Sequence, residues 1–199
     1  MNTIFPKYPR ILAIAPSTRG FGYAVLEGRK ELVDWGVKSV TGDKNAGSME
    51  KVEEIIAHYN PQVMVLEDTE AKGSRRSARI RVLTKRLIAL AESREIRVVL
   101  FSQKQVRRVF FADGCGTKHA LAEIIAGRFP DELGFRLPPK RRPWMSEDYR
   151  MDIFDATALA LAYLYRGPKA VEARQNGCHR IAESVKKSRR NAGERGRSL

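Results

Sequence analysis

The sequence predicts an α/β protein in which helices cover a mixed β-sheet. Residues 11–40 read as three consecutive strands joined in hairpin order. From residue 48 onward, short apolar strands alternate with amphipathic helices, which is typical of parallel strands joined by helical crossovers. The chain has 199 residues, 43% of them hydrophobic, so it can bury one sizeable core. We therefore expect a single folded domain at 1–166, followed by a basic tail at 167–199.

The first elements are defined by their apolar runs and turn residues. In residues 11–28, ILAIAPSTRGFGYAVLEG, an apolar run stops at a Pro-Ser-Thr-Arg-Gly turn and then resumes, which predicts a hairpin whose first strand is buried on both faces. Residues 31–40 continue as a third strand. Residues 48–60 place apolar side chains at helical spacing behind an expected N-cap at Ser48, and an Asn-Pro pair ends this helix.

The second half of the domain continues with alternating strands and helices. Two short apolar runs predict strands at 62–68 and 96–102. Periodic segments predict a loop and helix within 69–94 and further helices at 102–111, 117–129 and 147–167.

The charge of the chain indicates a polyanionic partner. There are 37 Lys and Arg against 23 Asp and Glu, giving +14 and a pI near 10.1. Residues 166–199 contain ten basic and three acidic residues, a net charge of +7, so half of the excess lies in the tail. We expect this tail to be an electrostatic arm, either disordered or helical on binding. Charge alone leaves nucleic acid and an acidic membrane surface open as partners.

Other bulk features predict a cytoplasmic protein. No apolar run approaches the roughly 20 residues of a membrane span, and residues 1–10 lack the apolar region of a signal peptide. Cys115 and Cys178 have no metal-ligand spacing, so we expect two reduced thiols without a functional role.

Three acidic residues are candidates for a metal site. Glu67 ends the strand at 62–68, and Asp152 and Asp155 lie three residues apart on one face of the last helix. Asp155 stands inside the strongly apolar IFDATALALAYL segment, where a charge is costly without a partner. If the three carboxylates converge, Mg²⁺, or Mn²⁺ in its place, would relieve their repulsion and activate water for phosphodiester cleavage. Taken singly, each also fits an ordinary ion pair.

Basic residues accompany these acids. Residues 71–86 carry seven positive and no negative charges, which suits a phosphate backbone better than a mixed solvated helix face does. A proline-rich PPKRRPW segment adds three more cations, and we expect Trp144 to anchor this loop by burial, with stacking on an exposed base as the alternative. The predicted contacts to nucleic acid are Arg75, Arg76, Arg79, Lys140, Arg141 and Arg142.

Four segments occur in an order that matches one known family. They are ILAIAPSTRGFGYAVL, VMVLEDT, SQKQVRRVFFADGCGTKHALAEII and DIFDATALALAY, spread over about 150 residues. This pattern resembles the RuvC-like Holliday junction resolvases of the RNase H-like superfamily. The resemblance stops at Gly167.

The resemblance implies an RNase H-like fold with a five-stranded mixed sheet and helices on both faces. It also implies metal-dependent cutting of branched DNA, often by a homodimer. Glu67, Asp152 and Asp155 would be the metal ligands. Lys118, together with Arg107 or Arg108, would contact phosphate near the scissile bond.

The sequence departs from this family at Ala15. The first aspartate of the superfamily, which bridges both metal ions, falls on this position, and a methyl group cannot bind a cation. The alanine is either an engineered inactivating change, a native residue of a protein that binds without cutting, or a position whose role Asp68 or Glu70 takes over. Because the other expected catalytic residues are present, restoring aspartate at position 15 is expected to create cutting activity.

Two other function classes follow from these observations. A non-enzymatic protein that binds structured DNA or RNA is the main alternative, and Ala15 is the observation that favours it. A nucleotide-binding fold of the actin and sugar-kinase type also begins with a strand, a turn and a hairpin. That fold needs a second similar lobe, for which 199 residues are too few.

Overall fold

The structure is a computed structural model that describes residues 9–29 and 31–166. The chain divides into two units, Met1–Tyr165 and Arg166–Leu199, and the first contains nearly all of the described residues. The predicted basic tail, 167–199, lies outside the described residues.

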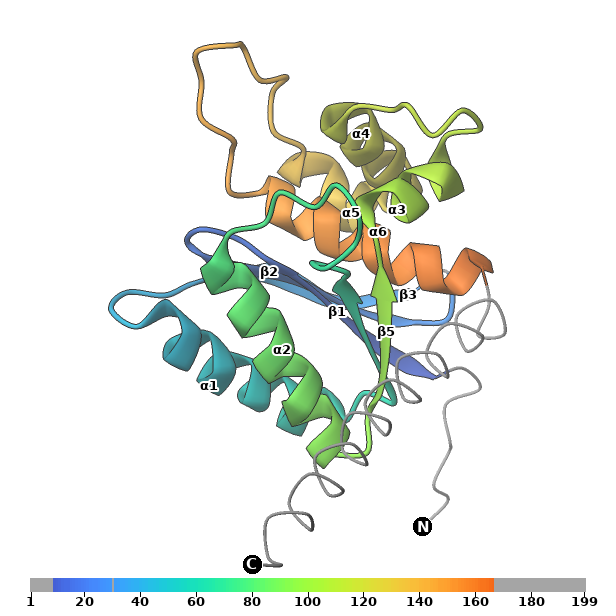
Figure 1. The fold of residues 1–199 in the computed structure, drawn as a ribbon. Helices are drawn as coiled ribbons and strands as arrows, with labels where there is room; N and C mark the ends of the chain where they lie inside the picture. The colour runs from blue at the N-terminus through green and yellow to red at the C-terminus, as the bar shows by residue number, and fades with distance from the viewer. Residues whose placement is uncertain (1–8, 30, 167–199) are drawn as a thin grey trace, which may run out of the picture. The chain divides into compact units, whose positions relative to one another are not determined.

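A five-stranded mixed sheet forms the centre of this unit, in the order β3-β2-β1-β4-β5 (Figure 1). The first three strands are antiparallel neighbours, whereas β1, β4 and β5 run parallel to one another. The predicted α/β class and mixed sheet are therefore confirmed. The strands are β1 (Arg10–Pro16), β2 (Gly20–Glu27), β3 (Glu31–Ser39), β4 (Val63–Glu67) and β5 (Arg97–Phe101).

Helices cover both faces of the sheet. Figure 1 shows α1 and α2 on one face, with α6 and the α3–α5 group on the other. Leu12 and Ile14 of β1 belong to the core under α1 and α2, so the alternating Ala13 and Ala15 face α6. The helices are α1 (Lys44–Tyr59), α2 (Ala78–Ser93), α3 (Gln103–Phe110), α4 (Lys118–Arg128), α5 (Pro130–Leu133), a 3₁₀ turn (Gly134–Arg136) and α6 (Met151–Arg166).

Two helix starts differ from those predicted. The N-cap of α1 is Asp43, whose carboxylate accepts hydrogen bonds from two backbone N–H groups of the first turn, so the prediction of Ser48 as the cap is wrong. Helix α6 starts at Met151 because Asp148 accepts a hydrogen bond from the backbone N–H of Arg150 and pairs with its guanidinium. Glu147 consequently stays in the preceding loop.

Gly22 allows α6 to approach the sheet closely. It pairs with Ala15 across the β1–β2 ladder, and a Cβ placed on it would lie 2.2 Å from the carbonyl oxygen of Asp152. Only a residue without a side chain leaves room for the first turn of α6 here. The ladder therefore brings Asp152 over the end of β1.

No helix in the described part of the chain is both long and apolar enough to cross a membrane.

Candidate functional site

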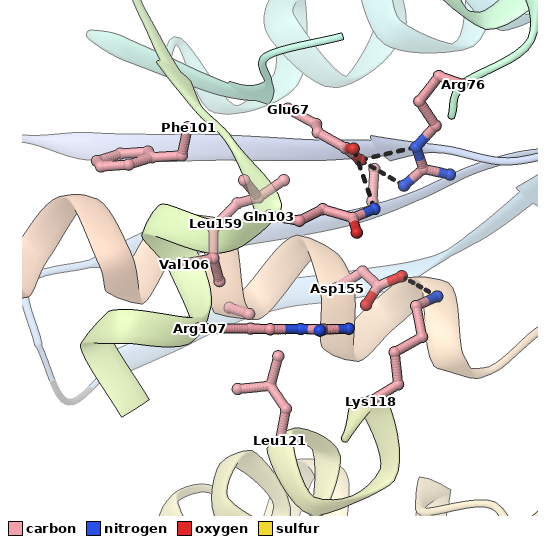
Figure 2. A pocket seen from close by; sticks show the side chains of 12 residues that line it. Glu67, Arg76, Phe101, Gln103, Val106, Arg107, Lys118, Leu121, Asp155 and Leu159 are labelled. Carbon is pink, nitrogen blue, oxygen red and sulfur yellow. Dashed lines mark hydrogen bonds and ion pairs between the residues drawn. The ribbon is translucent and has the colours of Figure 1, made fainter. Parts of the chain in front are cut away.

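The ends of two parallel strands form one wall of a cavity of about 40 Å³. Ile14 of β1 is in register with Leu66 of β4, so the next residues, Ala15 and Glu67, lie at the same edge of the sheet. Both are buried, with exposed fractions of 4% and 7%. Asp155 of α6 lines the same cavity from the opposite side (Figure 2). The topology thus brings three of the predicted site positions together.

Glu67 is hydrogen-bonded through both carboxylate oxygens. Arg76, from the loop before α2, donates to Oε2 from Nε at 2.9 Å and also from Nη2. Gln103 donates from Nε2 to Oε1 at 3.1 Å, as the dashed lines in Figure 2 show. The carboxylate of Glu67 therefore has a cationic partner that belongs to the chain itself.

The charge of Arg76 acts on more than one acid. Burial lowers its pKa, but the hydrogen bonds and charge of Glu67 and the charges of Asp155 and Asp152 outweigh burial, and the pKa is raised. The guanidinium thus remains charged among the three carboxylates that the sequence assigned to a metal.

Asp155 has a second cation of the chain as its partner. Lys118 Nζ, at the start of α4, lies 2.8 Å from Asp155 Oδ2 and 2.6 Å from Glu147 Oε1. Burial raises the pKa of the Asp155 carboxyl, and the charge of Lys118 opposes that rise. For Lys118, burial lowers the pKa, but Asp155 and Glu147 together raise it above its usual value. A three-residue ion cluster therefore joins α4, α6 and the loop before α6.

Asp152 lines an adjoining cavity of about 130 Å³, which it shares with Asp155, Arg76, Lys118 and Glu147. Burial raises the pKa of Asp152 to about 6; a contact with the Ser17 side chain lowers it, and the nearby charge of Asp155 raises it. The two aspartates of the last helix therefore do share one face, as their spacing predicts.

These residues do not fit a divalent-metal centre. Within 9–29 and 31–166, no three Asp, Glu, His or Cys side chains are grouped so that they could hold a metal ion. The predicted ligands Glu67, Asp152 and Asp155 are spread over two cavities, and two of them are ion-paired with Arg76 and Lys118. At position 15, where a bridging carboxylate was expected, there is a methyl group.

The two candidate replacements for the missing acid lie elsewhere. Asp68 follows Glu67 and accepts a hydrogen bond from the backbone N–H of Glu70, while the Glu70 side chain pairs with Lys85 at 3.5 Å. Neither acid lines the cavities described above. The structure therefore gives no support to the replacement of the lost carboxylate by a neighbour.

The predicted nucleic-acid contacts divide into paired and unpaired cations. Arg107 lines the cavity, Figure 2 shows its side chain pointing inward, and it pairs with no acidic side chain of the described residues. Arg79 is held by Asn45 Oδ1 at 3.1 Å and by the carbonyl of Ser17. The exposed members of the set are Arg75, Arg108, Lys140, Arg141 and Arg142.

Sequence reasoning missed two site residues and misjudged a third. Glu147 and Gln103 were not singled out, although Glu147 lies in the acidic stretch just before Asp152 and Gln103 follows the strand paired with Glu67. Trp144 is 77% exposed, so the expectation that it anchors its loop by burial is wrong. Three prolines near it hold the loop without an aromatic anchor.

Comparison with solved structures identifies the fold. The RuvC structure of Thermus thermophilus superposes with a TM-score of 0.61 and 17% identity, over 81% of this chain and 97% of that chain. The chain has the RuvC fold. The T. thermophilus RuvC in complex with a Holliday junction substrate gives a TM-score of 0.59 and 17% identity, over 80% of this chain and 94% of that one.

A third solved structure with a similar fold comes from yeast. The yeast mitochondrial Holliday junction resolvase Ydc2 gives a TM-score of 0.54 and 18% identity, over 82% of this chain and 80% of that one. No protein-family model matches the chain, and a search of curated proteins found no significant match.

Proposed function

We propose that this chain binds branched DNA through its RuvC fold, and that it does so without a divalent metal and without cutting. T. thermophilus RuvC, which has this fold, was solved in complex with a Holliday junction substrate, and this supports a four-way junction as the ligand. The net charge of +14 supports a polyanionic ligand of that kind. DNA affinity should accordingly fall steeply with salt, because phosphate contacts release counterions.

The observation that carries the proposal is the ion pair between Arg76 and Glu67 beside Ala15. Unpaired carboxylates at the end of the sheet would repel a phosphate backbone unless a cation neutralised them. In this chain Arg76 and Lys118 supply that positive charge from fixed positions. The acidic edge is therefore compatible with DNA in the absence of added metal.

The same pairs oppose a two-metal mechanism. Such a mechanism needs carboxylate oxygens free to bind the ions and to position the attacking water. The oxygens of Glu67 and Asp155 instead accept hydrogen bonds from Arg76 and Lys118, and Ala15 offers no oxygen. Loss of a shared metal ligand costs several kcal/mol of transition-state stabilisation, or roughly a thousandfold in rate.

Arg107 supplies the direct contact in this proposal. It lines the cavity without an acidic partner among the described residues, so its charge is available to a phosphate. Arg107→Gln should weaken junction binding about fivefold to tenfold at low salt. Arg94→Gln is the matched control, because Arg94 is exposed at the far end of α2 and carries the same charge.

The test measures binding and cutting in the same samples. A four-way junction and a duplex of equal length are titrated with the protein in Mg²⁺ and in EDTA, and the products are resolved on native and denaturing gels. We expect equal junction affinity in both buffers, weaker duplex binding and no cleavage product. Cutting at an enzyme-like rate in Mg²⁺ would show that another group holds the metal. Equal affinity for junction and duplex would reject branch recognition.

A further inference from the structure

Trp144 stands at the tip of a short turn on the surface. The backbone N–H of Met145 donates to the carbonyl of Arg142 at 3.0 Å, which closes a four-residue turn with Pro143 and Trp144 at its centre. Trp144 is 77% exposed, the highest exposure among the large hydrophobic residues of the described chain. Burial of an aromatic side chain of this size lowers the free energy, so its exposure indicates a surface that binds a partner.

The loop that carries Trp144 is fastened at both ends to the start of α4. Glu147 pairs with Lys118 at 2.6 Å, and the ring Nε2 of His119 is 3.1 Å from the carbonyl oxygen of Pro138. Figure 1 shows this loop, which leads into α6, rising away from the helices. Prolines restrict its backbone further. The indole is therefore presented from a fixed base, and little entropy is lost when it binds.

The charges around Trp144 select an anionic partner. Lys140, Arg141 and Arg142 are all exposed, and the guanidinium of Arg142 lies over the indole ring at 5.7 Å from its centroid. The two acids of the loop, Glu147 and Asp148, are paired with Lys118 and Arg150. The turn therefore combines one open aromatic face with three cations that no loop acid neutralises.

We propose that Trp144 stacks on an unpaired DNA base, while Lys140 and Arg141 contact the phosphates on either side of it. A nucleobase next to a phosphate is a ligand that has both a flat apolar face and a negative charge. At a branch point the continuous stacking of the duplex is interrupted, so the bases there unpair more easily than those inside a duplex arm. The stacking contact itself requires only an unpaired base, whereas its use at a junction rests on the function proposed above.

Fluorescence of Trp144 tests this contact directly. The chain has two tryptophans, so Trp35→Phe leaves Trp144 as the only indole. This variant is titrated with a four-way junction, a junction with one unpaired base at the branch, a single strand and a duplex. We expect quenching by the single strand and by both junctions, with little change on duplex. Trp144→Ala should weaken single-strand and junction binding about tenfold, and Trp144→Phe should restore most of it.

Phe135→Ala is the matched control. Phe135 is 65% exposed, and the guanidinium carbon of Arg136 lies 5.0 Å from the centroid of its ring. Phe135 thus resembles Trp144 in its surroundings, but it lies outside the loop that carries Trp144. Its loss should leave both affinities unchanged. Unchanged Trp144 emission while a junction is bound on gels would reject stacking and leave the proposed function intact. Quenching by single strands without junction preference would support stacking and reject the proposed function.

Two further outcomes reject the stacking contact. Absence of binding to every DNA would reject both proposals. If Trp144→Ala changes only the sedimentation of the protein, the indole serves a contact between two copies of the chain.

Discussion

Arg76 donates two hydrogen bonds to a single oxygen of Glu67, one of them from Nε at 2.9 Å. Gln103 donates to the other oxygen, so both oxygens of this carboxylate already accept hydrogen bonds from the chain itself. A metal ion would first have to displace a guanidinium that three nearby acids hold in place.

Ala15→Asp alone should not create a metal site, because Arg76 would pair with the new carboxylate as it does with Glu67. The double variant Ala15→Asp with Arg76→Gln removes the competing cation and should bind Mn²⁺ measurably by isothermal titration calorimetry. Ala15→Asp with Arg75→Gln is the control, since Arg75 is exposed and carries the same charge. Equal Mn²⁺ binding by Ala15→Asp alone would contradict the role given to Arg76.

Arg76→Gln should lower the free energy of unfolding by roughly 2–4 kcal/mol, because it leaves Glu67 buried without its cation. In a double-mutant cycle with Glu67→Gln, urea unfolding should give a coupling energy of roughly 1–3 kcal/mol. The Glu70–Lys85 pair is the control, since its side chains are 56% and 70% exposed. The coupling energy of this exposed pair should be zero within experimental error. Similar coupling energies for both pairs would contradict the stabilising role given to Arg76.

Asp152→Asn should stabilise the protein at pH 8 by about 2 kcal/mol and have little effect near pH 4. The pKa of this carboxyl is about 6 when folded, against 3.8 for an unperturbed aspartate. Below pH 4 the group is neutral in both states, whereas above pH 6 the folded state alone bears the cost of a buried charge. Stability is thus lost as the pH rises from about 4 to about 6, between the pKa of the unfolded state and that of the folded state.

Urea titrations of wild type and Asp152→Asn from pH 4 to pH 8 measure this difference. Asp43 provides an internal contrast, because hydrogen bonds from Ala46 and Asn45 lower its pKa. Its contribution is present at neutral pH and is lost as the pH falls. A pH-independent effect of Asp152→Asn would mean that Asp152 titrates normally.

Gly22→Ala should destabilise the fold by several kcal/mol, because its Cβ would lie 2.2 Å from the carbonyl oxygen of Asp152. Gly127→Ala in α4 is the control: nothing lies within 4 Å of its Cβ, and helix propensity favours alanine. Thermal unfolding should show a large loss for the first variant and a small gain for the second. Equal melting temperatures would mean that α6 docks differently from the description above.

The fold followed from the sequence because its signals are local. Apolar runs broken by turn residues defined the strands of 11–40, and strands alternating with periodic helices defined the rest. The misplaced N-cap has a local cause too. A glycine at position 47 interrupts the apolar pattern, so the sequence gives no sign that the first turn of α1 begins directly after Asp43.

The site was only partly predictable because its decisive contacts join distant segments. The spacing of Asp152 and Asp155 placed them on one helix face, and both line the same cavity. Nothing local shows that Arg76, nine residues beyond Glu67, folds back onto it rather than reaching toward solvent. For the same reason, the sequence showed only one departure from a metal site, the missing carboxylate at Ala15. The structure adds that Glu67 and Asp155 are already paired with Arg76 and Lys118.

The position of α6 over Gly22 also bears on how the protein is made. Because α6 follows all five strands along the chain, the sheet face that holds Ala13 and Ala15 lacks the cover of α6 while the ribosome is still synthesising residues 151–166. At roughly 5–20 residues per second, this interval lasts on the order of seconds after the last strand has been synthesised. A chaperone that shields apolar sheet surface would therefore act on this protein late in translation. Slow codons before Met151 would lengthen the time for which the chain needs that chaperone.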